Sequence, residues 1–215
     1  MESNAASSLP PDEPPDIAEQ IAATLAERGW CVTDDFIPPL LVSQLRHEAE
    51  TLWRRGAFRR AGVGHGAGRE VRNAVRTDRV AWLDPERLSA AQRLYWDAVE
   101  RLRLAVNRTM LLGLLELEAH LAVYPPGSYY RRHLDQFRGI GQRRLSCVLY
   151  LNDAWTEADG GALCIYHDPE HPHARVEVLP VGGRLTTFLS ARFLHEVLPA
   201  RRERLSITGW LRTRS

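Results

Sequence analysis

Three side chains of this chain could bind one metal ion together. His133 and Asp135 lie two residues apart in a stretch that favours a β-strand, and His195 lies in a later strand-like stretch. Residues two apart on a strand project to the same face, so one strand can offer both His133 and Asp135 as ligands. Two histidines and one carboxylate are the ligands of the facial triad, which holds non-haem Fe(II) and leaves its opposite positions open. Because a histidine near an aspartate also arises by chance, a surface pair with a core histidine is the alternative.

Arg204 is the second sign of a binding site. With a turn over residues 199–203, Arg204 would begin the strand next to the one that contains His195. An arginine that faces a β-core is costly unless it is paired, and the strand that follows Arg204 contains no acidic residue. A small dicarboxylate would satisfy the guanidinium through two parallel hydrogen bonds. Thr208 and Trp210 follow at period two and would share the face of Arg204; a solvent-facing Arg204 is the alternative.

The strands that must position these residues occupy the second half of the chain. Short β-rich stretches follow one another from residue 116, and turns that contain glycine or proline separate most of them. Many short strands at regular spacing are typical of a sandwich or barrel. Residues 116–213 are therefore predicted to form the jelly-roll core of an α+β domain. The stretches are LEAHLAVY, YYRRHLD, RLSCVLYLN, GALCIYH, ARVEVL, RLTTFLS, LHEVLP and RLSITGWL.

The preceding part of the chain, residues 16–115, is predicted to be mainly helical and to support that core. Apolar residues recur at helical spacing over residues 16–28, and Gly29 follows as a C-cap. A short strand is expected at Trp30, and further helices are expected from about residue 39 and over residues 89–112. Residues 61–84 begin with alternating glycines that neither follow a strand nor open a helix, which argues against a dinucleotide-binding fingerprint. We predict a mobile substrate loop there.

Composition narrows the remaining classes of protein. The 215 residues suit a single domain, predicted over residues 16–215, and the formal net charge of +1 favours neither nucleic acid nor an acidic membrane as a partner. Residues 1–15 have the serine, proline and acidic bias of a disordered tail and lack the features of a signal peptide. No apolar run is long enough to span a bilayer. Three widely spaced cysteines favour a reducing, cytoplasmic location.

The stretch from Tyr124 to Trp210 resembles the 2-oxoglutarate- and Fe(II)-dependent oxygenases of the prolyl 4-hydroxylase family. It is most similar to the bacterial relatives of the oxygen-sensing prolyl hydroxylases, and the likeness extends over residues 30–213. The resemblance implies a double-stranded β-helix, the cupin-like form of the jelly-roll barrel, with supporting N-terminal helices. The matching motifs are Arg76-Thr77-Asp78, Trp82-Leu83, Tyr124-Pro125-Pro126-Gly127, His133-Leu134-Asp135, Tyr150-Leu151-Asn152 with Trp155, Gly160-Gly161, His195-Glu196-Val197 and Arg204 to Trp210.

The same resemblance implies a role for each matching residue. The Fe(II) ligands would be His133, Asp135 and His195. The pocket for 2-oxoglutarate would consist of Arg204, Tyr150, Tyr124, Thr208 and Trp210. The contacts to the substrate would come from Arg143, Trp155, Arg76 and Asp78. Trp155 could instead be structural.

The implied reaction is hydroxylation of a prolyl residue in a protein or peptide. O2 would be the second co-substrate, ascorbate an accessory reductant, and succinate and CO2 the products of 2-oxoglutarate. A translation factor is one candidate partner. Three alternatives stay open: the same chemistry on a free amino acid or small metabolite, a non-catalytic cupin-like sensor of metal or 2-oxoglutarate, and a zinc hydrolase.

Other polar clusters are assigned to the surface. Residues 167–173 contain histidines and acidic residues between two strands and are predicted to form a solvated hairpin loop. His65 is assigned to the glycine-rich loop, and His120 to the core or a barrel face. Arginines beside the metal motif form a basic rim, which is either a solvated edge or a mouth that attracts an acidic segment. They are Arg131, Arg132, Arg138, Arg143 and Arg144.

Overall fold

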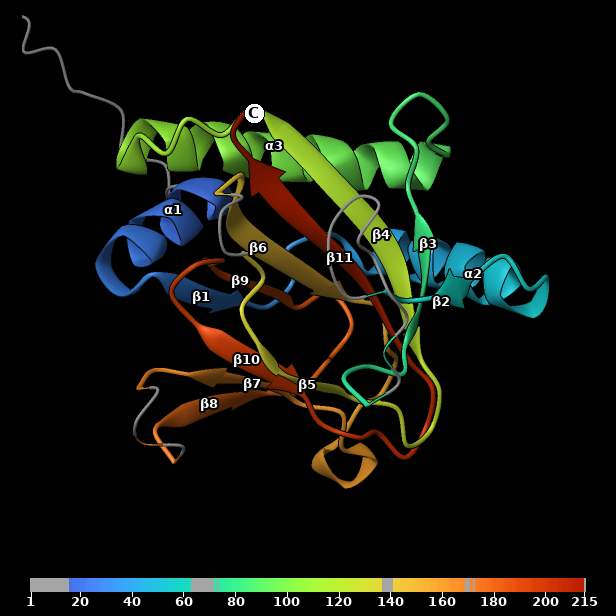
Figure 1. The fold of residues 1–215 in the computed structure, drawn as a ribbon. Coiled ribbons are helices and arrows are strands. Elements are labelled where there is room, and N and C mark those ends of the chain that lie inside the picture. Colours follow the sequence, from blue (N-terminus) through green and yellow to red (C-terminus); the bar gives the residue numbers. More distant parts are fainter. Residues whose placement is uncertain are drawn as a thin grey trace, which may run out of the picture.

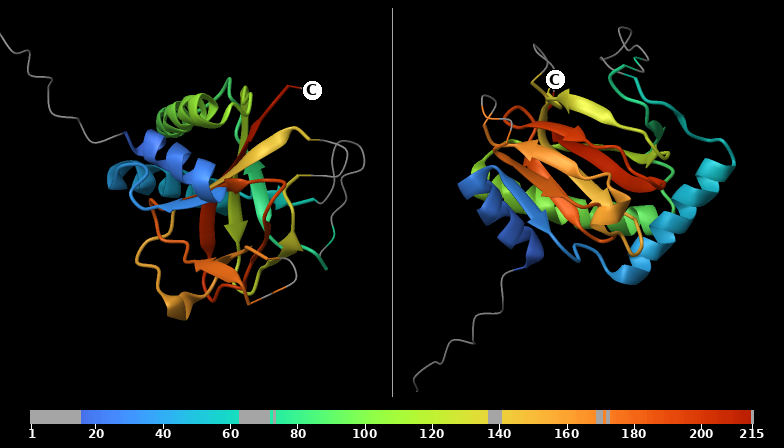
Figure 2. Two further views of the ribbon diagram at one scale, coloured as in Figure 1. Left: turned by 90° about the vertical axis from the view of Figure 1, so that its left-hand side faces the viewer. Right: turned by 90° about the horizontal axis from the view of Figure 1, so that it is seen from below.

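The computed structural model describes residues 16–62, 72, 74–136, 141–168, 171 and 173–214. Within them, the α-helices lie on one face of a seven-stranded sheet and a four-stranded sheet lies on the other face, as Figure 1 and Figure 2 show. The helices are α1 (Ile17–Arg28), α2 (Pro39–Arg54), α3 (Ala90–Met110) and a short 3-10 helix (Glu157–Asp159). The predicted tail over residues 1–15 lies outside the described residues.

Both sheets are antiparallel, as a jelly-roll requires. The larger sheet has the order β1-β9-β6-β11-β4-β3-β2, and the smaller has the order β5-β10-β7-β8. The larger consists of β1 (Trp30–Thr33), β9 (Leu185–Leu189), β6 (Arg143–Tyr150), β11 (Arg204–Arg212), β4 (Glu116–Tyr124), β3 (Arg79–Trp82) and β2 (Arg59–Arg60). The smaller consists of β5 (Tyr130–His133), β10 (Leu194–Val197), β7 (Leu163–Tyr166) and β8 (Arg175–Val178). Each strand expected after residue 116 is present, with ends shifted by a few residues.

Period-two alternation gives the larger sheet two different faces. On β11, Leu205, Ile207 and Leu211 belong to the apolar core beneath the helices, whereas Arg204 and Trp210 face the smaller sheet. The same alternation in β4 and β6 separates this helix-side core from a second core between the sheets. Each fully buried leucine or isoleucine contributes roughly 1.5–3 kcal/mol. The helix-side core therefore offsets the cost of polar and charged residues on the inner face.

Helix ends follow the sequence signals. Helix α1 ends at Gly29, whose φ of 81° permits the left-handed cap that its N–H makes to the Leu25 carbonyl. Helix α3 begins at Ser89 in a capping box with Gln92, and both side chains also donate to Glu48 of α2 at 2.7 and 2.9 Å. These bonds join α2 to α3 over the sheet. No described helix is long and apolar enough to cross a bilayer.

Two expectations need correction. Residues 61–84 are not one continuous loop, because β3 lies within them and pairs with β2 and β4. A strand of four residues is too short to show a period in the sequence. Residues 63–71 and 73 lie outside the described residues, and so does the central part of the predicted substrate loop. Arg204 is also not in the strand adjacent to His195, because β10 belongs to the smaller sheet and β11 to the larger one.

Candidate active site

The predicted metal ligands lie together between the two sheets. His195 of β10 is the direct cross-strand partner of His133, the last residue of β5, and Asp135 follows just beyond the end of β5. The expected strand is thus shorter than predicted and ends before Asp135. Asp135 Oδ1 lies 3.4 Å from His133 Nε2, and Asp135 Oδ2 lies 3.5 Å from His195 Nε2. One ligand atom from each residue falls within 4.8 Å of the others, which is the spacing of a shared metal ion.

The protonation states of the side chains in this cluster suit the binding of a cation. Burial lowers the pKa of His133, and the neighbouring His195 lowers it further, so His133 is neutral at physiological pH. Burial opposes ionisation of Asp135, but the adjacent His195 and His133 hold the pKa of its carboxyl well below the usual value. Neutral imidazole and ionised carboxylate are the forms that bind metals.

The histidine rings are oriented by backbone carbonyls. His133 Nδ1 lies 2.7 Å from the Arg131 carbonyl, and His195 Nδ1 lies 3.1 Å from the Phe193 carbonyl. Donation from Nδ1–H to these oxygens leaves the lone pair of Nε2 directed at the space beside Asp135. Metal-binding histidines in proteins are commonly fixed in this way.

Asp135 is anchored by two serines that sequence reasoning missed. Ser146 Oγ of β6 donates to Asp135 Oδ2 at 2.7 Å, and Ser190, just after β9, lies 2.9 Å from Ser146 Oγ. Both serines are fully buried. The available signal was a serine at an inward period-two position of the apolar stretch RLSCVLYLN.

Arg204 faces the triad from the opposite sheet. Its side chain is 1% exposed, its Nε donates to the Gly161 carbonyl at 2.9 Å, and its guanidinium carbon lies 5.0 Å from the ring centres of both Tyr124 and Tyr150. Its Nη2 is buried and has no hydrogen-bond partner among the described residues. A buried, unpaired guanidinium nitrogen is costly, so this end of Arg204 suits an anionic ligand.

A cavity of about 200 Å³ joins the triad to Arg204. Five further predicted site residues line it, namely Tyr124, Thr208, Trp210, Arg143 and Arg76. Trp82, His120 and Leu134 also line it. Trp82 and Leu134 are 46% and 38% exposed, so they lie where the cavity opens to solvent.

Known proteins resemble this chain in sequence and fold. Residues 119–212 match the family model of the 2OG-Fe(II) oxygenase superfamily. A prolyl-4-hydroxylase from Pseudomonas putida has 40% sequence identity and a TM-score of 0.81, with 93% of this chain and 100% of that chain covered. The chain belongs to the 2OG-Fe(II) oxygenase superfamily. It falls in the prolyl 4-hydroxylase branch, and the jelly-roll prediction is confirmed.

Two other relatives are animal proteins. A prolyl hydroxylase from Trichoplax adhaerens, in complex with a hypoxia inducible factor peptide fragment, has 27% identity and a TM-score of 0.80 over 91% of this chain and 89% of that chain. The hypoxia-inducible factor prolyl hydroxylase of Caenorhabditis elegans is 29% identical over an alignment of 213 residues, and the match covers 93% of this chain and 28% of that protein. This oxygenase therefore spans little more than a quarter of the length of the nematode relative.

The residues of this oxygenase fit the cofactors of its family. The His133–Asp135–His195 cluster has the donor set for Fe(II), and the unpartnered Nη2 of Arg204 suits a carboxylate of 2-oxoglutarate. Gly161 allows Arg204 its position, since a Cβ there would lie 2.8 Å from Ala200 Cβ and 3.2 Å from Arg204 Cδ. No larger residue fits between the Gly160-Gly161 turn and β11 without a shift.

Tyr150 and Trp155 lie behind the cavity of this oxygenase instead of lining it. Tyr150 is fully buried beside Arg204, and its hydroxyl accepts a hydrogen bond from Thr186 at 3.3 Å. Trp155 is buried and donates to the Gly160 carbonyl at 2.9 Å, and the guanidinium carbon of Arg202 lies 4.2 Å from its ring centre. This position favours the structural alternative for Trp155 over a direct contact with substrate.

Arg76 and Asp78 form an ion pair beside the cavity. Arg76 donates two hydrogen bonds to the Asp78 carboxylate at 2.7 and 2.5 Å. Asp78 is buried, with 1% of its surface exposed. Arg76 also lies 4.1 Å from the ring centre of Tyr130, whose other face stacks on His133 at 3.5 Å. Asp78 therefore positions Arg76, and Arg76 is the member of the pair that reaches the cavity.

Arg143 and three aromatic side chains form another part of the wall of the active-site cavity, and these side chains are Trp82, His120 and Trp210. The Arg143 guanidinium lies 3.6 Å from the ring centre of Trp210, and its Nε donates to Glu118 at 2.8 Å. His120 is buried between Trp82 and Trp210, with ring centres at 4.8 and 5.5 Å. The prediction that His120 lies on a barrel face agrees with this position.

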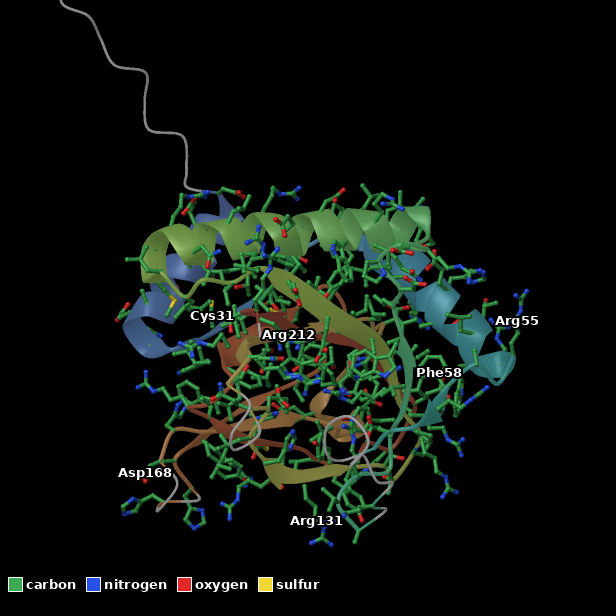
Figure 3. The ribbon with its side chains drawn as sticks, turned by 45° about the horizontal axis from the view of Figure 1, so that its top comes forward. Cys31, Arg55, Phe58, Arg131, Asp168 and Arg212 are labelled. Carbon is green, nitrogen blue, oxygen red and sulfur yellow. The ribbon has the colours of Figure 1, made fainter. Side chains whose placement is uncertain are left out.

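The other polar clusters stay apart from the metal site. His171 pairs with Asp168 at 2.7 Å, and Figure 3 shows Asp168 at the outer edge of the molecule. Arg131 projects outward in the same view, consistent with a basic rim. His65 and Arg138 lie outside the described residues.

Proposed function

We propose that this oxygenase hydroxylates a prolyl residue in a protein substrate and converts 2-oxoglutarate to succinate and CO2. The observation that carries the proposal is the buried, unpartnered Nη2 of Arg204, a residue that lines the same cavity as the His133–Asp135–His195 cluster. The relatives from Pseudomonas putida and Trichoplax adhaerens are prolyl hydroxylases, and the second binds a peptide. When bound, Fe(II) and 2-oxoglutarate supply the activation of O2 that hydroxylation of a C–H bond needs.

The residues of the chain bind and orient the co-substrate, and they exclude water from it. Arg204 holds the distal carboxylate of 2-oxoglutarate, and Tyr150 supports the guanidinium from behind the cavity. Tyr124, Thr208 and Trp210 enclose the co-substrate, and the apolar side chains around them keep the cavity dry. Burial raises the pKa of Tyr130 to about 12, so the phenol that stacks on His133 stays neutral.

A polypeptide substrate suits the mouth of the cavity. Trp82 and Leu134 are exposed there, and the flanking Arg76 and Arg143 can donate hydrogen bonds to backbone carbonyls. A free amino acid would leave the exposed Trp82 and Leu134 uncovered. An exposed loop of an abundant protein such as a translation factor is the partner we favour, and ascorbate would serve as accessory reductant.

We also propose that the protein acts in the cytoplasm. Cys31, Cys147 and Cys164 are free and buried, as is usual in a reducing compartment.

Anaerobic titration with Fe(II) and 2-oxoglutarate tests the proposed function. We expect a charge-transfer absorbance band for the wild type, and Arg204→Ala should bind 2-oxoglutarate about tenfold or more weakly, since charge-assisted hydrogen bonds are lost. Arg101→Ala, on the outer surface of α3, is the matched control. Succinate release should depend on proline-containing peptides.

Metal specificity separates the remaining alternatives. Activity restored by Zn(II) and not by Fe(II) would indicate a hydrolase, and binding of 2-oxoglutarate without any turnover would indicate a sensor. Absence of the absorbance band, with unchanged 2-oxoglutarate affinity in Arg204→Ala, would refute the oxygenase assignment of this pocket.

A further inference from the structure

A second cavity adjoins the active site at the edge of the larger sheet. It lies at the β2–β3 pair and is lined by Arg60, Ala61 and the segment from Arg76 to Arg79. Ala61 and Arg76 also line the active-site cavity, so the two spaces share a wall. Figure 1 shows β2 and β3 at the end of the larger sheet beside α2. We call this second space the arginine groove.

Like charges face each other across this groove. Arg60 of β2 is the direct cross-strand partner of Arg79 of β3. Directly opposed like charges destabilise an antiparallel pair. Two arginines at this register therefore cost stability in the free protein, and an anion between them would reverse the sign of that contribution.

The described residues supply no anion to this pair. Asp78 is the acidic residue that lines the groove, but it is buried and its carboxylate is fully engaged by Arg76. Arg60 is exposed and forms no ion pair within the described part of the chain, and Arg79 lies over the Trp53 ring at 5.7 Å. With Arg60, Arg76 and Arg79 against Asp78, the groove keeps an excess of positive charge.

We propose that the arginine groove binds a carboxylate side chain, aspartate or glutamate, that flanks the target proline in the polypeptide substrate. The proposal rests on the proposed function, because the occupant is part of the same substrate. Arginine recognises carboxylates through two parallel hydrogen bonds, which gives a fixed position as well as affinity. The groove would thus select substrates by an acidic residue at a set distance from the proline.

A peptide series tests the groove. Each short synthetic peptide contains one proline and a single glutamate, moved in turn through the flanking positions, in an otherwise neutral sequence. Binding is measured by fluorescence anisotropy with the Mn(II)- and 2-oxoglutarate-loaded protein. At one or a few positions, glutamate should tighten binding about tenfold relative to alanine. R60E should remove that gain and favour lysine at the same position, whereas R101E, on the outer surface of α3, should behave as the wild type.

Three controls separate the outcomes. R60E should consume 2-oxoglutarate without peptide at the wild-type rate, since Arg60 does not line the active-site cavity. Its thermal stability should equal or exceed that of R101E, because a like-charge pair is removed. A loss of stability in R60E would mean that Arg60 serves a contact inside the protein and would overturn the proposal.

The peptide data themselves can also overturn it. If glutamate changes affinity at no position, or if R60E keeps the preference for glutamate, the groove does not recognise acidic residues. The proposed prolyl hydroxylation is not refuted by that result. If the wild type binds and hydroxylates no proline peptide, the proposed function fails, and the groove proposal fails with it.

Discussion

Replacement of Gly161 by alanine tests how the position of Arg204 is set. Gly161 has φ +69°, a conformation that L side chains rarely adopt, and its carbonyl accepts the hydrogen bond from Arg204 Nε. A Cβ at Gly161 would lie 2.8 Å from Ala200 Cβ and 3.2 Å from Arg204 Cδ. Ala200 has no flexible side chain that could move aside, so the Gly160-Gly161 turn or β11 must shift.

The cost of this substitution has two parts. An alanine held in the left-handed backbone conformation costs about 1–2 kcal/mol. Overpacking of a filled interior adds about 1–3 kcal/mol. Gly56 is the matched control, because it has the same φ of +69° and nothing lies within 4 Å of a Cβ there. We therefore expect Gly161→Ala to lower the free energy of unfolding by about 2–5 kcal/mol and Gly56→Ala by about 1–2 kcal/mol.

Two assays measure these effects. Urea unfolding gives the change in stability, and anaerobic titration gives the affinity for 2-oxoglutarate. Displacement of Arg204 should weaken binding about tenfold or more in Gly161→Ala, which corresponds to about 1.4 kcal/mol, and leave Gly56→Ala unchanged. Equal losses of stability in the two variants, or wild-type affinity in Gly161→Ala, would refute the reasoning.

Two further substitutions test the support of the site. Ser146→Ala should weaken Fe(II) binding about 10- to 100-fold, because the hydrogen bond that orients Asp135 is lost, and Ser146→Thr should retain most of the affinity. Metal competition titration checks this, and equal affinity in the wild type and Ser146→Ala would contradict it. Asp78→Asn should lower the free energy of unfolding by about 3–5 kcal/mol, since it leaves the Arg76 charge unpaired in a buried site. The exposed pair of Asp34 with Arg184 is the control, and Asp34→Asn should cost less than about 1 kcal/mol in the same denaturation assay.

The sequence was sufficient to predict the residues whose positions follow from strand periodicity. His133 and Asp135 are two apart, and Arg204, Thr208 and Trp210 share one face of β11, so local geometry brings each set together. The strands after residue 116 were also predictable, since turns with glycine or proline mark most of their ends. These features depend on short-range chain geometry.

Features that depend on how distant strands meet were not predictable. Ser146 is one polar residue in an apolar stretch, and its contact with Asp135 exists only because β6 passes beneath the end of β5. The turn between β10 and β11 does not reveal that the chain changes sheets, so His195 and Arg204 were expected on neighbouring strands. Burial of the ion pair between Arg76 and Asp78 depends on β3 joining β4, which no local pattern indicates.

The change of sheets between β10 and β11 bears on which oxo-acid this oxygenase accepts. The two histidine ligands belong to the smaller sheet and Arg204 to the larger one, so a bound dicarboxylate must bridge the layer between them. Packed sheets lie about 10 Å apart, and that separation depends on the side chains that fill the layer. Phe188 of β9 and Ile165 of β7 belong to this filling, and Phe188 lies 4.6 Å from His195 between ring centres. The carbon-chain length of the co-substrate is therefore determined by the volume of the inter-sheet core, and a change in that length requires repacking of residues that never contact the ligand.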